Sequence, residues 1–348
     1  MVNTLENQGN YNINENEVTI DNSCGDDCLG HTITGESSQF TIQITGGTHN
    51  ITLQGVKIDA SGCAFALENG AAVNLTLVGT NSLKSGAGYA GLQVPDGAKI
   101  TINGSGDASL TAQGGSQGAG IGGGMETPGG NITITGGAVR AIGGDWAASI
   151  GDGDNAAGKK PGTSANITIA GGEVTLSTNQ NSEGGCLGYA DDAGATGGSV
   201  SITGGELSNK PAVKVGTITG ISGCILTPLE GDTSLEAAND CLLVQGDTIT
   251  VRGAYTLQED FTLDMGETLE ISAGATFNTG SAALTNNGTI QLNGGTLTVN
   301  SYSGSGTVYK SGLSTLNGAA ADTSPPSRPA LPGTFCYPPI RWLRTQTT

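Results

Sequence analysis

Oxygen-bearing side chains gather in a glycine-rich stretch that reads IGDGDNAAGKK, where Asp152, Asp154 and Asn155 stand close together. Ca²⁺ prefers hard oxygen ligands of this kind. The stretch is not an EF-hand, because a bidentate glutamate at the twelfth loop position is missing. Asp191 and Asp192 lie in the expected equivalent loop of the next repeat and would complete the coordination shell. The pattern predicts a calcium site; the alternative is two solvated acidic loops.

Aromatic residues make up only 4% of the sequence, so their positions are informative. Tyr89, Trp146 and Tyr189 each fall within four residues of an apolar position that recurs in the repeat described below. Sugar rings stack on flat aromatic faces, and parallel repeats would bring these three residues towards one edge. We therefore expect a carbohydrate-binding edge, with Trp146 exposed as its main stacking residue. The alternative is that each aromatic ring caps the core beside a long corner loop.

Lys159 and Lys160 follow the acidic loop, which supplies the nominal parts of a calcium-dependent, pectate-type polysaccharide lyase. Such an enzyme uses the cation to acidify a uronate proton and a base to remove it. A lysine base must be desolvated near the metal, whereas AAGKKPG is typical of an exposed turn. The two histidines, His31 and His49, lie far from the acidic loops in sequence, which disfavours a hydrolase.

The seven cysteines are too few and too scattered for a disulfide framework. Cys24 and Cys28 form one C-x₃-C pair, for which we expect a local disulfide or two buried thiols rather than a metal site. Cys63 is expected to face the core. Cys224 and Cys241 flank an irregular segment and would bridge it in an oxidising compartment.

The chain carries 31 acidic against 13 basic residues, a net charge of −18, which makes nucleic acid and anionic membranes unsuitable partners. The charge is compatible with divalent cations and neutral ligands. No apolar run is long enough to span a membrane, so we expect no membrane insertion. The first residues lack the charged and apolar regions of a signal peptide, so we expect that a signal peptide is absent or was removed.

A repeat of 24–35 residues organises the chain. Its segments alternate apolar and polar residues, as in a strand with one buried face. One series of equivalent apolar positions is Ile51, Leu75, Ile100, Ile132, Ile167 and Val200, and another is Phe65, Leu92, Ile121, Ile150 and Leu187. Three short strands joined by glycine turns predict one triangular coil of a right-handed parallel β-helix, an all-β solenoid with glycine at its corners.

The glycine-rich segments GAGIGGG and GGNITITGG, with GTHNITLQGVKIDAS, resemble the secreted right-handed β-helix proteins of Gram-positive bacteria. These include calcium-containing β-helix domains that bind cellulose and pectic polymers. The resemblance covers about residues 40–208. It implies an extracellular or cell-surface carbohydrate-binding or adhesin-like protein, with a cellulose- or pectin-like polysaccharide as partner.

The pattern changes along the chain, which suggests five segments. We predict an N-terminal cap, the main β-helix, a connecting insertion with a short helix in TSLEAAND, a smaller β-solenoid and a disordered tail, over residues 1–40, 41–208, 209–245, 246–318 and 319–348. Within the smaller solenoid, Leu269 and Ile271 recur as Ile290 and Leu292.

Together these observations predict a non-catalytic extracellular module that recognises a plant or microbial polysaccharide, assisted by Ca²⁺. Two alternatives stay open. One is the calcium-dependent lyase, and the other is a structural stalk that spaces another domain from a cell wall.

Overall fold

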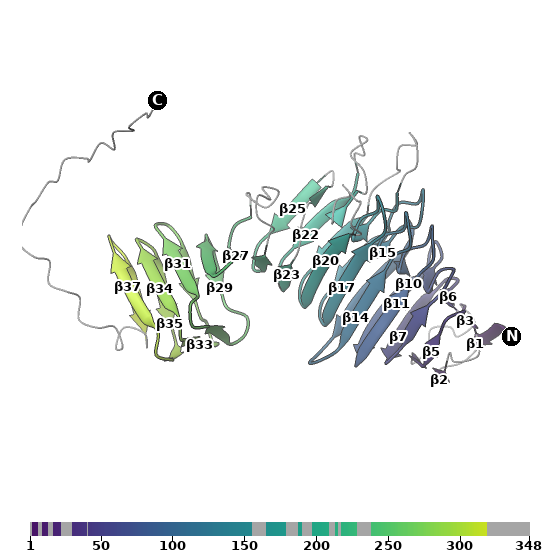
Figure 1. The fold of residues 1–348 in the computed structure, drawn as a ribbon, viewed down its shortest axis with the longest axis horizontal. Coiled ribbons are helices and arrows are strands. Elements are labelled where there is room, and N and C mark those ends of the chain that lie inside the picture. The colour runs from purple at the N-terminus through teal and green to yellow at the C-terminus, as the bar shows by residue number, and fades with distance from the viewer. Residues whose placement is uncertain are drawn as a thin grey trace, which may run out of the picture.

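The fold is an all-β solenoid, seen in a computed structural model (Figure 1). The structure describes residues 2–5, 9–12, 17–21, 30–39, 41–154, 165–178, 187–189, 197–208, 213–214, 217–227 and 238–318. These ranges contain strands and turns and no helix. The helix expected in TSLEAAND falls mostly on residues outside the described part, as do the tail from residue 319 and the cysteine pair Cys24 and Cys28.

From the coil that contains β3 and β4 onward, each coil of the main stack contributes one described strand to each of three faces, and each strand pairs in parallel with its equivalent in the next coil. The first face contains β1 (Val2–Leu5), β3 (Glu17–Ile20), β6 (Ile42–Ile44), β9 (Phe65–Leu67), β12 (Leu92–Gln93), β15 (Ile121–Gly122), β18 (Ile150–Gly151), β21 (Leu187–Gly188) and β24 (Val213–Lys214). The second face contains β2 (Gly9–Asn12), β4 (His31–Thr34), β7 (Thr48–Gln54), β10 (Ala72–Val78), β13 (Lys99–Gly104), β16 (Asn131–Ile134), β19 (Asn166–Ile169), β22 (Ser199–Ile202) and β25 (Thr217–Ile221).

The third face runs through the whole molecule and joins the main stack to a smaller one. Its strands are, in order, β5 (Glu36–Ser37), β8 (Lys57–Asp59), β11 (Thr80–Lys84), β14 (Ser109–Gln113), β17 (Ala138–Gly143), β20 (Glu173–Thr178), β23 (Glu206–Ser208), β26 (Ile225–Thr227), β27 (Cys241–Gln245), β28 (Thr248–Arg252), β31 (Thr268–Ser272), β34 (Thr289–Asn293) and β37 (Thr307–Ser311). The smaller stack is completed by β29 (Ala254–Thr256), β32 (Thr276–Asn278), β35 (Thr296–Val299) and β38 (Thr315–Gly318), and by β30 (Phe261–Leu263), β33 (Ala283–Asn286) and β36 (Ser301–Ser303).

The direction of the chain reverses between the two stacks. Strand β27 runs parallel to β26, whereas β28 pairs with β27 in antiparallel fashion, and the parallel coils resume from β28 to β31. Alternate side chains of β27 serve different cores: Cys241 and Leu243 belong to the larger core and Leu242 to the smaller one. The two stacks therefore share one wall, which Figure 1 shows between β23 and β31.

The inward ladders follow the sequence repeat. Phe65, Leu92, Ile121, Ile150 and Leu187 are successive partners on the first face, as predicted. In the smaller stack, Leu269 pairs with Ile290 and Ile271 with Leu292, also as predicted. These aligned positions are buried and form the two apolar cores.

One predicted register is wrong by two residues. The alignment of Leu75 with Ile100 is not observed, because Leu75 pairs with Ile102 and Val73 pairs with Ile100. A slip of two residues keeps the same side chains on the buried face, so the alternation of apolar residues does not reveal it.

The cysteines of the described part are free thiols. Cys224 and Cys241 are buried and not bridged, and Cys63 is half-buried with its Sγ donating to the Phe65 carbonyl oxygen at 3.4 Å. Burial raises the pKa of Cys224 to about 12 and that of Cys241 to about 11. All three behave as small core residues rather than as reactive thiols.

In the first face, the backbone of Gly122 lies directly against that of Gly151. Gly122 has φ +136°, and a Cβ at this position would clash with the carbonyl oxygen of Gly151. We expect Gly122→Ala to destabilise the central coils by about 3–5 kcal/mol, because it combines a strained φ with overpacking. A methyl group added at Gly62 would meet no atom within 4 Å, so Gly62→Ala is the matched control. Chemical denaturation of both variants tests this; equal midpoints would contradict the register.

Candidate functional site

Three seven-residue corner loops connect the third face to the first and align residue by residue: GAGYAGL (86–92), GSQGAGI (115–121) and GDWAASI (144–150). The backbone ladder continues through them, since Gly88 N donates to the Ser116 oxygen and Gln117 N to the Asp145 oxygen, at 2.8 and 3.2 Å. Equivalent bonds join the other loop positions. The hydrogen-bonded stacking of the strands therefore continues through these corners.

The third residue of each corner loop has a left-handed backbone. Its φ is +84° at Gly88, +70° at Gln117 and +65° at Trp146. A left-handed conformation costs a residue with a Cβ about 1–2 kcal/mol, which glycine avoids. Trp146 bears this cost and also leaves 47% of its side chain exposed. The exposure of Trp146 is as predicted. This one bulky apolar residue therefore has both an unfavourable backbone conformation and an apolar surface exposed to water.

Tyr89 and Met125 lie on the same side of the molecule as the corner of Trp146. Tyr89 is 41% exposed and follows Gly88 in its loop. Met125 is 44% exposed; its N–H donates to the Gly88 oxygen at 2.8 Å, and a Cβ at Gly88 would lie within 4.0 Å of the Met125 side chain. We call Tyr89, Met125 and Trp146 the corner platform. Tyr89 and Trp146 belong to corners two coils apart, a rise of about 10 Å.

Asp154 fixes the loops beneath the corner platform. Its Oδ2 accepts a hydrogen bond from Gln117 Nε2 at 2.8 Å, and its N–H donates to the Gln117 oxygen at 2.9 Å. Its own carbonyl oxygen accepts from the N–H of Glu126, the neighbour of Met125, at 2.6 Å. Asp154 is only 8% exposed, so it holds two loops together from inside.

Asp152 also points inward and binds backbone groups. It is 2% exposed, and its Oδ1 accepts from the N–H groups of Gly129 at 2.8 Å and Ala165 at 3.3 Å. Hydrogen bonds from N–H groups stabilise the charged form of a carboxylate. Ca²⁺ takes six to eight oxygens, and no group of three or more potential metal ligands occurs in the described part of the chain. Both described aspartates have hydrogen-bond partners within the protein.

Several predicted site residues fall outside the described ranges: Asn155, Asp191, Asp192, Lys159 and Lys160. Calcium binding and the lyase base therefore stay predictions. Tyr189 is described but is not one of the residues of the corner platform. It follows the strand position Leu187, whereas Tyr89 and Trp146 precede theirs, so it sits at the other end of the strand. It is 7% exposed, and its hydroxyl donates to the Gly197 oxygen at 2.5 Å, so its ring is no open stacking face.

His31 and His49 are buried beside each other near the start of the main stack, with ring centroids 5.9 Å apart. Burial and the neighbouring His49 lower the pKa of His31. Sequence reasoning missed this pair and also missed Met125. The sequence gives one indication of Met125: its long apolar side chain directly follows three glycines, at a position outside the predicted core ladders.

Comparison with protein-family profiles, with characterised proteins and with solved structures found no match to this chain. No helix in the described ranges is long and apolar enough to span a bilayer.

We expect Asp152→Ala to lower the free energy of unfolding by about 1–3 kcal/mol in the presence of a chelator, because two buried N–H groups lose their acceptor. Asp152→Asn keeps an acceptor oxygen and should be milder. Thermal denaturation with added Ca²⁺ and with EDTA separates this role from metal binding. If both variants abolish a calcium-dependent stabilisation equally, Asp152 acts as a metal ligand rather than as an internal acceptor.

Proposed function

We propose that this protein is a non-catalytic, extracellular carbohydrate-binding module of adhesin type, and that the corner platform binds a neutral plant or microbial polysaccharide. The observation that carries this proposal is Trp146, an exposed tryptophan with φ +65° on a rigid corner. Backbone strain at an ordered site is a pointer to function. Exposed aromatic faces suit the apolar faces of sugar rings.

The rigidity of the corner supports the proposal. Gln117 and Asp154 join neighbouring loops under the platform, so the aromatic groups need little ordering when a ligand binds. Preorganisation of this kind raises affinity by lowering the entropy lost on association. Tyr89 and Trp146 belong to stacked coils, so a linear polymer running along the solenoid axis would meet both.

The charge of the protein favours a neutral polymer. At a net charge of −18, an acidic polysaccharide would be repelled unless a cation intervened. Calcium assistance is part of our proposal only for such acidic polymers. Neutral glucans would bind by stacking and hydrogen bonding alone. The lyase and the structural stalk are kept as outcomes of the experiment below.

We expect Trp146→Gly to weaken retention on an insoluble neutral glucan about tenfold or more, a loss of about 1.4 kcal/mol, since it removes the large apolar face against which a sugar ring would pack. Glycine occupies the equivalent corner position as Gly88, so the fold should keep its stability within about 1 kcal/mol or gain slightly. Tyr309, 61% exposed in the smaller stack, provides the control Tyr309→Ala, which should bind normally.

Other outcomes would contradict the proposal. Unchanged retention of Trp146→Gly would remove the platform as the site, and no retention of the wild type on any polysaccharide would favour a stalk. Sustained release of an unsaturated product from polygalacturonate would show a lyase instead.

A further inference from the structure

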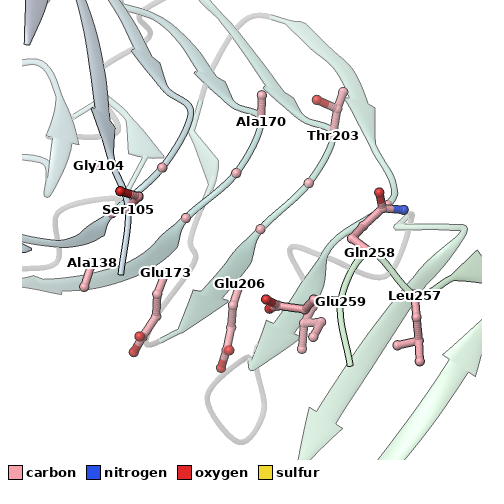
Figure 2. A pocket seen from close by; sticks show the side chains of 18 of the residues that line it. Gly104, Ser105, Ala138, Ala170, Glu173, Thr203, Glu206, Leu257, Gln258 and Glu259 are labelled. Carbon is pink, nitrogen blue, oxygen red and sulfur yellow. The ribbon is translucent and has the colours of Figure 1, made fainter. Parts of the chain in front are cut away.

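A groove lies where the two stacks meet, on a different corner from the platform (Figure 2). Its volume is about 740 Å³. The floor is formed by corners between the second and third faces. The end wall is formed by the loop of the smaller stack that contains Gln258. We call it the junction groove, and its principal lining residues are Gly137, Gly172, Gly205, Glu173, Glu206 and Glu259.

A row of glycines lies in the floor of the junction groove, beside the small side chains of Ser105, Ala170 and Thr203 (Figure 2). A Cβ at Gly172 would lie 2.6 Å from the Gly137 oxygen, and one at Gly205 would lie 2.5 Å from the Gly172 oxygen, so side chains are excluded at these positions of successive coils. The result is a trench with exposed backbone that runs along the solenoid axis for several coils of about 4.8 Å each. A linear ligand could therefore lie directly on the backbone.

The walls of the groove are acidic. Glu173 and Glu206 are register partners at the starts of β20 and β23, and Figure 2 shows their side chains pointing the same way from neighbouring strands. Glu259 and Asp260 come from the smaller stack, and no lysine or arginine stands among the described residues that line the groove. Two ion pairs of the described chain lie elsewhere, between Lys57 and Glu36 and between Lys84 and Asp59.

The carboxylates of the groove repel one another. Burial, then the charges of Glu173 and Glu259, raise the pKa of Glu206. Like charges on directly opposed strand positions are destabilising. Asp260 is held in place because its Oδ1 accepts from the N–H of Ala283 at 2.8 Å. A positively charged ligand would relieve this repulsion.

We infer that the junction groove binds an oligosaccharide that carries protonated amino groups. The volume lies within the range of about 300–1,000 Å³ usual for small-ligand sites. The amines would pair with Glu173, Glu206 and Glu259, and the flat faces of the sugar rings would lie on the glycine floor. Phe261, half-buried in the end wall, adds an apolar surface.

The shape of the groove favours this ligand over smaller cations. A divalent metal ion needs a compact shell of oxygens, and the described residues contain no cluster of three or more potential metal ligands. A linear polyamine satisfies the charge but leaves most of a trench of about 740 Å³ unfilled. Rings joined in a chain satisfy both the charge and the width.

The test is calorimetric titration of the full chain with a glucosamine oligomer, with its N-acetylated counterpart of equal length, and with spermine. We expect binding of the glucosamine oligomer and at least about tenfold weaker binding of the other two. Glu173→Gln with Glu206→Gln should weaken glucosamine binding about tenfold or more. Glu68→Gln with Asp96→Asn makes the same charge change at another corner and should leave binding intact.

Each remaining outcome bears on the inference. Equal binding of spermine, or equal losses in the two double variants, would show a general charge effect and overturn it. Binding of the N-acetylated oligomer that survives the Glu173 and Glu206 changes would do the same. Trp146→Gly should not alter titration of the groove, so failure of the platform proposal and failure of this one are distinguishable.

Discussion

The close approach of consecutive coils is the constraint on which this molecule depends. Strands stacked about 4.8 Å apart leave no space for a Cβ wherever two corners pass in contact. The chain meets this constraint with glycine, which has no side chain, as at Gly122. Where there is more room, a short polar side chain joins neighbouring coils: Asn81, 1% exposed, accepts from Val56 N at 2.9 Å and donates to the Ser109 oxygen at 3.1 Å.

The close contact of neighbouring loops also gives a structural role to Asp152 and Asp154, which resemble metal ligands in sequence. Asp152 joins the N–H groups of two separate loops, and Asp154 joins Gln117 to the backbone near Met125. Both occupy corners where ladder bonds end and backbone donors need acceptors. Clustered carboxylates in a glycine-rich loop therefore have a structural use as well as a metal-binding one. Sequence spacing does not separate these uses, because both place carboxylate oxygens close together in a glycine-rich loop.

Much of the fold could be predicted from the alternation of apolar residues, because burial of one strand face has a period of two. That period also sets the limit of prediction: the partner of Ile100 is Val73 rather than Leu75, a slip that leaves every buried residue buried. The candidate site is harder to predict from the sequence than the fold. The exposure of Trp146 is predictable because Ile150 already fills the ladder, whereas proximity to Leu187 puts Tyr189 on the wrong end of its strand. A short distance along the chain shows that a residue lies near a strand, but an unsigned distance does not show at which end of the strand it lies.

A triangular coil presents three corners, and in this chain their chemistry differs. The corner before the first face carries exposed aromatic groups, the corner after it holds the buried Asp152 and Asp154, and the corner before the third face forms a glycine-lined groove with acidic walls. Equivalent positions on successive coils differ by one rise of about 4.8 Å along the axis, so a ligand lying along the axis contacts several coils at once. The extended ligands that we propose for the corner platform and for the junction groove would both use the stacking in this way, on two different corners.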